Sequence, residues 1–98
     1  MDSEVAMAHY VLTYHFKPFM TREEVAAMME VYGSIGQAPG ASANLVWADG
    51  TGGTVIGETD DTEALYRNLL SYGEWMEFDL KPVLPVEKAT SHVADYLT

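Results

Sequence analysis

The sequence predicts an α+β fold in which four strands and two helices follow each other as β-α-β-β-α-β, with a further helix at the C-terminus. Two observations predict it. Runs that alternate between apolar and polar residues and are rich in aromatic and β-branched side chains are typical of half-buried strands, and between them lie segments with apolar residues three and four positions apart, which are typical of amphipathic helices. This order gives a four-stranded antiparallel sheet with two helices on one face, for which we expect the strand order 4-1-3-2.

The first strand is predicted over Ala8–Phe16 (AHYVLTYHF), because this run is dense in aromatic and β-branched residues and is followed by the pair Lys17-Pro18. Thr21 and Glu24 have the spacing of a capping box, so a helix begins there. Gly33 is placed to end it. The apolar residues of this helix form one stripe: Val25, Met28, Met29 and Tyr32.

A hairpin follows. The second strand is predicted over 42–48 (SANLVWA) and the third over 53–58 (GTVIGE), and the turn Asp49-Gly50-Thr51-Gly52 joins them. An Asp-Gly pair between two strand-like runs is a good hairpin signal, because both residues tolerate positive φ.

The second half of the chain predicts a helix, a strand and a last helix. Asp60 and Glu63 repeat the cap spacing, and an apolar stripe runs from Leu65 to Tyr72, which we expect in the core. The fourth strand is predicted over 75–83 (WMEFDLKPV). Apolar residues at helical spacing then predict a third helix over 85–97: Val86, Ala89, Val93 and Tyr96 or Leu97.

The composition limits the classes of function. The 98 residues include 15 Asp and Glu against 5 Lys and Arg, a formal charge of −10, so the surface repels the phosphates of a nucleic acid. Hydrophobic residues make up 48% and cysteine is absent, so an apolar core must hold the fold. No apolar stretch approaches the about 18 residues of a membrane span. We expect neither nucleic acid nor membrane as a partner, and a cytoplasmic location.

The domain organisation follows from the same patterns. Residues 1–7 lie outside any periodic segment, and we expect them to form a disordered leader. No linker, repeat or low-complexity run interrupts the remainder, so residues 8–98 are predicted to form a single domain.

Strand alternation divides the predicted sheet into two faces. The more apolar sets should face the helices: Tyr10, Leu12, Tyr14, Phe16, Val55, Met76, Phe78 and Leu80. The opposite sets mix polar and apolar residues: His9, Val11, Thr13, His15, Thr54, Ile56, Glu58, Trp75, Glu77 and Asp79. With Trp47, this second face would leave a large apolar area in water. We therefore expect a second copy to cover it, as a two-fold homodimer.

Three sequence segments carry a family resemblance: YHFKPFMTREE, DGTGGTVIGETDD and WMEFDLKPVLPVEKA. With the order of elements, they resemble the dimeric α+β barrel proteins, a ferredoxin-like superfamily, and within it most closely a small bacterial family of unknown function. The resemblance covers roughly residues 8–95. It implies a homodimer with internal pockets and many chemistries, among them antibiotic-biosynthesis monooxygenases, haem-degrading oxygenases, muconolactone-type isomerases and small stress-responsive barrels. Asn44, Trp47 and the three histidines lie outside the motif context of the haem-degrading branch, whose roles are not carried over.

Three residues of the second face are candidate catalytic groups: His9, His15 and Glu58. Imidazole changes charge near neutral pH, so either histidine suits a general base or a hydrogen-bond donor to a ligand. The structural alternative is a histidine paired with Glu58 or Glu77 in the dimer interface. The two histidines lie six residues apart on one strand, about 20 Å, so they cannot share a metal within one subunit. Glu58 is the best acid candidate, and its structural alternative is an interaction with the following helix start.

Other residues of that face are candidate ligand contacts: Thr13, Trp47, Ile56, Trp75 and Glu77. Dimer packing is the alternative for the two tryptophans, and a solvated edge strand is the simpler interpretation of Glu77 and Asp79. No spacing typical of a metal site occurs, and the sequence identifies no cofactor.

The functional hypothesis is a homodimeric barrel that binds a small, largely apolar organic molecule between sheet and helices. The resemblance adds cofactor-independent oxygenation or isomerisation as reaction classes. The alternative is a non-catalytic binding, stress-response or assembly module, in which the His and Glu residues only stabilise the dimer.

Overall fold

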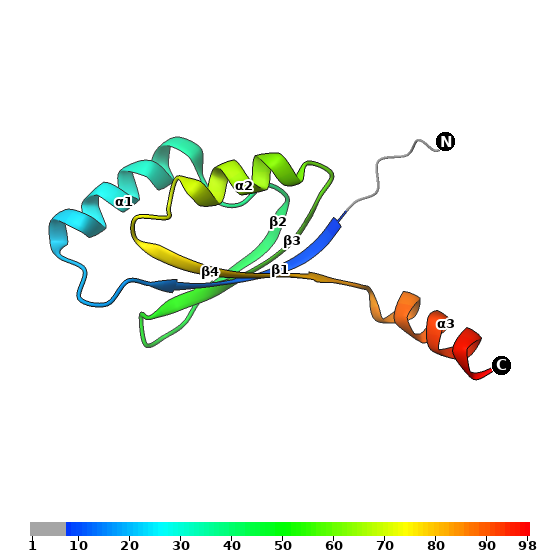
Figure 1. The fold of residues 1–98 in the computed structure, drawn as a ribbon. Coiled ribbons are helices and arrows are strands. Elements are labelled where there is room, and N and C mark those ends of the chain that lie inside the picture. The colour runs from blue at the N-terminus through cyan, green and yellow to red at the C-terminus, as the bar shows by residue number, and fades with distance from the viewer. Residues whose placement is uncertain (1–7) are drawn as a thin grey trace.

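The computed structural model describes residues 8–98, so the predicted leader lies outside the described residues. Its elements are β1 (Ala8–Phe16), α1 (Arg22–Ile35), β2 (Ala41–Val46), β3 (Gly52–Thr59), α2 (Thr62–Leu70), β4 (Met76–Val83) and α3 (Val86–Leu97). The four strands form one antiparallel sheet in the order β2-β3-β1-β4. The predicted α+β class and strand order are confirmed, and α1 and α2 cover one face of the sheet (Figure 1).

The register of the central strands decides which side chains meet the helices. Tyr10 lies opposite Gly57 and Tyr14 opposite Gly53 on the neighbouring strand β3. A Cβ atom at either glycine would collide with the ring and hydroxyl of the tyrosine across from it. The two glycines therefore let both tyrosine rings lie over β3 under the helix layer.

The helix-facing set of the sheet forms the core. One buried cluster contains Tyr10, Leu12, Tyr14, Ala38, Val55 and Leu65, and a second contains Met28, Tyr72 and Trp75. The predicted faces of β1 and β3 and the core position of Tyr72 are confirmed. Trp75 was predicted on the other face, and this is wrong. The strand begins only at Met76, so Trp75 sits in the turn after α2, where its amide donates to the carbonyl of Tyr72 and its side chain is 7% exposed.

The capping box at the start of α1 is present. The Glu24 amide donates to Thr21 Oγ1 at 3.1 Å, and the Thr21 amide donates to Glu24 Oε1 at 2.9 Å. Gly33 does not end the helix, which continues to Ile35. The chain turns instead at Gly36, whose φ of 74° favours glycine and whose amide donates to the carbonyl of Tyr32.

Two further boundaries differ from the sequence prediction. The N-cap of α2 is Asp61 rather than Asp60, because Asp61 Oδ1 accepts from the amide of Ala64 at 3.0 Å. Strand β2 ends at Val46, two residues early, where the turn toward Asp49 begins. Strand β4 continues through Pro82, which the sheet accommodates because β4 is an edge strand.

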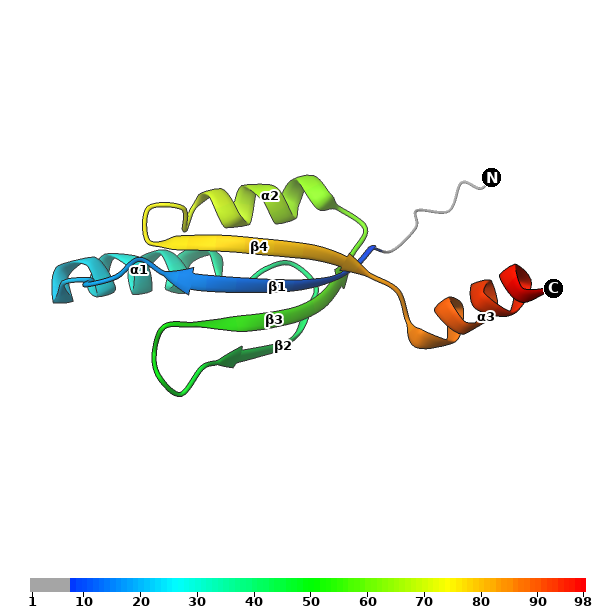
Figure 2. The ribbon, with the colours of Figure 1, turned by 60° about the horizontal axis from the view of Figure 1, so that its bottom comes forward.

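The last helix, α3, stands apart from the rest. Both views show it beyond the end of the sheet (Figures 1 and 2), and none of its residues is buried. The radius of gyration is 16.5 Å, against about 13 Å for a compact chain of this length. Within residues 8–98, no helix has the length and apolarity that crossing a bilayer requires.

Candidate functional site

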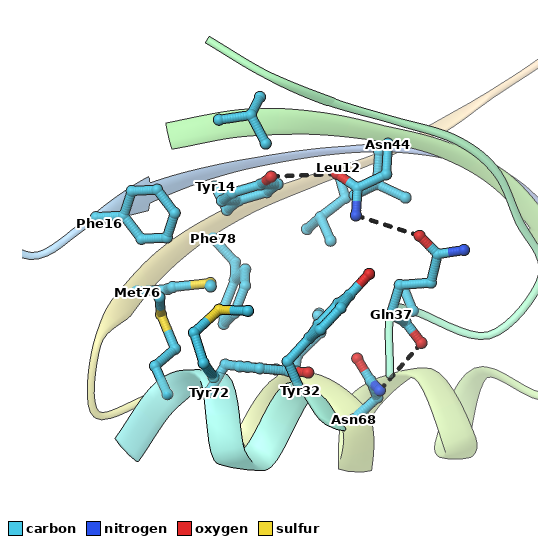
Figure 3. A pocket seen from close by; sticks show the side chains of 16 residues that line it. Leu12, Tyr14, Phe16, Tyr32, Gln37, Asn44, Asn68, Tyr72, Met76 and Phe78 are labelled. Atoms are coloured by element: carbon cyan, nitrogen blue, oxygen red, sulfur yellow. Dashed lines mark hydrogen bonds between the residues drawn. The ribbon is translucent and has the colours of Figure 1, made fainter. Parts of the chain in front are cut away.

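A cavity of about 240 Å³ lies between the helix layer and the sheet. Side chains from β1, β2, β3, β4, α1, α2 and the segments next to them point into it (Figure 3). The lining residues are Leu12, Tyr14, Phe16, Met28, Met29, Tyr32, Gln37, Ala38, Asn44, Val46, Val55, Asn68, Leu69, Tyr72, Met76 and Phe78. The cavity therefore uses the same helix-facing set that builds the core.

The walls of the cavity are mostly apolar, and its mouth lies between α1 and β2. Met29 on α1 is 53% exposed and Val46 on β2 is 64% exposed, whereas Leu12, Met28 and Val55 are buried. Because β2 is an edge strand, solvent reaches the cavity from that side. A ligand would enter past the flexible Met29 side chain.

One wall carries a chain of polar groups. The hydroxyl of Tyr14 donates to Asn44 Oδ1 at 3.1 Å, and Asn44 Nδ2 donates to Gln37 Oε1 at 3.2 Å. Tyr32 reaches from α1 toward this wall (Figure 3). Within residues 8–98, no side-chain hydrogen bond engages the Tyr32 hydroxyl or Gln37 Nε2. Both groups are free to bind a polar atom of a ligand.

The loop that carries Gln37 is fixed from the side of α2. The hydroxyl of Tyr72 donates to the carbonyl of Gly36 at 2.6 Å, and Asn68 Nδ2 donates to the carbonyl of Gln37 at 3.3 Å. These bonds hold the backbone of the loop at two successive carbonyls. The amide of Gln37 is therefore presented from an anchored backbone.

The phenols of Tyr14 and Tyr72 stay protonated at neutral pH. Burial raises the pKa of Tyr14 and of Tyr72, and a charge on the neighbouring Tyr32 would raise both pKa values further. Among residues 8–98, the side chains that line the cavity include no carboxylate, imidazole, amine or thiol. The polar wall can therefore donate and accept hydrogen bonds, but it supplies no group that titrates near neutral pH.

The catalytic candidates from the sequence lie on the opposite face of the sheet, which we call the open face. His9 and Glu58 are opposite each other on β1 and β3, with His9 Nδ1 at 3.2 Å from Glu58 Oε2. His15 lies toward the other end of β1, where its ring meets the edge of Trp47 at a centroid distance of 5.1 Å. None of these four side chains lines the cavity. The geometry matches the structural alternative of a His–Glu pair.

The candidate ligand contacts divide in the same way. Thr13 lies opposite Thr54 and Asp79, and His15 lies opposite Glu77, which places Thr13 and Glu77 on the open face. Ile56 lies beside Val11 there and is largely exposed. Trp75 is the exception described above. Among the described residues, no group of three His, Cys, Asp or Glu side chains is arranged to hold a metal ion.

The sequence prediction missed the polar wall of the cavity. One signal was present: Asn44 lies opposite Val55 and so is on the helix-facing side of the sheet, where its exposed amide lines the cavity. Tyrosine rather than phenylalanine at position 14, on the same face, is the matching donor. Gln37 and Tyr32 carried no such signal, because a loop residue and a helix residue show their partners only in three dimensions.

Residues 8–97 match the family model described as Domain of unknown function (DUF3303). The chain therefore belongs to this family, in agreement with its resemblance to a family of unknown function. No curated protein matches the chain. The wider resemblance to dimeric barrels stays a prediction.

Proposed function

We propose that this protein binds a small, largely apolar organic molecule that carries one hydrogen-bonding group, in the cavity between the helices and the sheet. The single observation that carries the proposal is the polar wall of Tyr14, Asn44 and Gln37 inside a mostly apolar cavity. A concave apolar site with few convergent polar groups is the usual form of a small-ligand site.

The volume and the polar groups indicate the class of ligand. The cavity of about 240 Å³ is smaller than the roughly 300–1,000 Å³ of sites for drug-sized molecules, so one or two fused rings fit it. The rings would lie against Met28, Leu69 and Phe78. A hydroxyl or carbonyl oxygen would accept from Gln37 Nε2 or from the Tyr32 hydroxyl.

Binding is favoured over acid–base catalysis. A general base works best with a pKa near the operating pH, and the phenols of Tyr14 and Tyr72 have raised pKa values. The candidate catalytic groups His9, His15 and Glu58 lie across the sheet from the cavity. Oxygenation or isomerisation, the reaction classes that the resemblance implies, would have to proceed with phenol and amide groups alone.

Calorimetric titration with 2-naphthol tests the proposal. We expect saturable binding that is at least tenfold weaker for naphthalene, which lacks the hydroxyl. Met29→Trp should block the mouth and abolish binding, whereas Tyr66→Trp, on an exposed position of α2 outside the cavity, should bind like the parent protein. Equal binding of 2-naphthol by both variants would place the ligand elsewhere and overturn the proposal.

We propose further that the open faces of two copies pack together in a homodimer. Apolar side chains on the open face are Val11, Leu45, Trp47, Ile56 and Val83. Leu45, Ile56 and Val83 are exposed, whereas Val11 and Trp47 are partly buried. Exposed apolar side chains that gather on one sheet face favour a protein partner there. The His9–Glu58 pair on the same face would be shielded in the dimer, which strengthens its charge-assisted hydrogen bond.

A further inference from the structure

Within residues 8–98, helix α3 has no packing partner that buries any of its residues. It has no buried residue, and both views place it beyond the end of the sheet (Figures 1 and 2). A helix of 12 residues is marginal in water when it stands alone. Another surface must therefore cover it if the helix is to persist.

The face of α3 that needs cover is well defined. Its larger apolar side chains lie on one side at helical spacing: Val86, Val93, Tyr96 and Leu97. All four are mostly exposed, up to 87% for Tyr96. Lys88, Ser91 and Asp95 lie on the opposite side. This pattern is typical of a helix whose apolar face packs on a protein surface.

A matching surface lies at the other end of the sheet. The segment after β1, the start of α1 and the β2–β3 turn enclose a groove of about 490 Å³. We call it the loop groove, and its apolar lining consists of Phe16, Pro18, Phe19, Met20, Val25 and Met28. Phe19 is 97% exposed and has a φ of 60°, a conformation that costs about 1–3 kcal/mol for a residue of this kind. A strained, fully exposed aromatic at a groove is suited to a contact with another chain.

We propose that α3 is an exchanged arm, which packs its apolar face into the loop groove of the partner subunit. This inference rests on the proposed homodimer and adds a second contact to it. Figure 1 shows α3 on the side of the sheet opposite α1 and α2, which is the side from which a partner would cover the open face. The arm therefore leaves toward the other copy.

The proposed dimer symmetry would bring the two surfaces to the same level. In a dimer whose two-fold axis lies between the two open faces, level with the middle of β1 and at right angles to the strands, Phe16 of the partner subunit lies over Ala8. Ala8 is next to His9, which pairs with Val83 at the end of β4. The segment 16–20 of the partner subunit then lies where β4 passes into α3.

Charge complements this arrangement. The last turn of α3 contains no basic residue, and Asp95 adds to the negative end of the helix dipole. The loop groove has Lys17 in its lining, where it pairs with Glu24, and Arg22 lies at the adjacent start of α1. A cation beside a helix C-terminus is favourable, and Arg22 of the partner subunit would supply one to α3 in this arrangement.

Crosslinking of engineered thiols tests the arm. The chain contains no cysteine, so the double variant Val25→Cys/Val93→Cys carries one thiol in the groove and one on the apolar face of α3. With a short bismaleimide, we expect a covalent dimer on denaturing electrophoresis. The matched control is Val25→Cys/Ser91→Cys, with the second thiol on the polar face, and its yield of covalent dimer should be several-fold lower.

The outcomes separate the two proposals. An intramolecular crosslink within a single chain would show that α3 folds back on its own subunit. A yield of covalent dimer no higher than that of the control would show that α3 packs elsewhere. Either result overturns the proposal of an exchanged arm. Light scattering on the untreated sample measures the oligomeric state independently. A dimer mass together with a failed crosslink refutes the exchanged arm alone, whereas a monomer mass refutes both the arm and the homodimer. Binding of 2-naphthol tests the cavity in either case.

A second pair of variants keeps the test independent of crosslinking. Val93→Asp should raise the dimer dissociation constant at least tenfold, because it puts a charge into the apolar contact. Ser91→Asp adds the same charge on the polar face of α3, and its dimer dissociation constant should stay within threefold of that of the parent protein. Helix content by circular dichroism checks that both variants fold, and an equal effect of both would contradict the proposal.

Discussion

Asn44 connects the sheet to the loop that presents Gln37. Replacement by leucine, Asn44→Leu, removes the acceptor of the Tyr14 hydroxyl and the donor to Gln37. We expect the free energy of unfolding to fall by about 1 kcal/mol, the usual net value of such a bond, and the affinity for 2-naphthol to approach that for naphthalene. Urea unfolding and calorimetry measure the two effects. Unchanged selectivity between the two compounds would exclude the polar wall as the recognition element.

Gly53 and Gly33 form a contrasting pair of positions. A Cβ at Gly53 would meet the ring of Tyr14 and lie 2.6 Å from the carbonyl oxygen of Leu45, so Gly53→Ala should destabilise the protein by about 1–3 kcal/mol. A Cβ at Gly33 would meet nothing within 4 Å, and that residue lies within α1. Gly33→Ala should therefore stabilise by about 0.5–1 kcal/mol. Thermal unfolding of both variants checks the opposite signs.

At the scale of elements, the start of α1 makes the stability of the protein depend on pH. The ion pair with Lys17 and the hydrogen bond from the Thr21 amide lower the pKa of Glu24 below its ordinary value of 4.5. A lowered pKa in the folded state means that this stabilisation is present above pH 4.5 and is lost as the pH falls through the folded value. Glu24→Gln should flatten the dependence of unfolding free energy on pH in that range, whereas Glu23→Gln, also in the first turn, should change it less.

The order of elements was predictable because periodicity and caps are local. Thr21 with Glu24 marks a helix start by itself, and Ala8–Phe16 alternates without help from the rest of the chain. The errors lie at positions whose conformation or burial depends on tertiary contacts. Gly33 continues the helix because no packing forces a turn there, and Trp75 is buried because the turn after α2 folds it against Met28 and Tyr72.

The site was less predictable than the fold. Strand alternation correctly placed His9, His15 and Glu58 on one face of the sheet, but it does not show which face has a cavity beside it. That depends on the spacing between the helix layer and the sheet, to which side chains such as Met29, Asn68 and Phe78 contribute from distant parts of the chain.

At the scale of the whole molecule, each chain brings a formal charge of −10 to the proposed dimer. Two such chains repel each other, and salt screens this repulsion over a Debye length of about 10 Å at 0.1 M. We expect the dimer to tighten as the ionic strength rises from low to physiological values. Sedimentation equilibrium measures the dissociation constant of the dimer. A dissociation constant that rises with salt concentration would indicate that ion pairs, rather than apolar contacts, hold the dimer together.

The open face itself can be tested by one substitution. Ile56→Asp places a charge at its centre, beside Val11, and should shift the mass in light scattering from twice the chain mass of 10.8 kDa toward the single value. Tyr66→Asp, on the far side of α2, serves as the control and should stay dimeric. A monomer mass for the parent protein would contradict the dimer directly.

The sheet is a single layer, and the mouth of the cavity between α1 and β2 opens away from the open face, on which a second copy would pack. A bound ligand can thus exchange with solvent while the two subunits remain associated. Each subunit would bind its own ligand molecule, and the number of ligand molecules bound per chain should be the same at low and at high protein concentration.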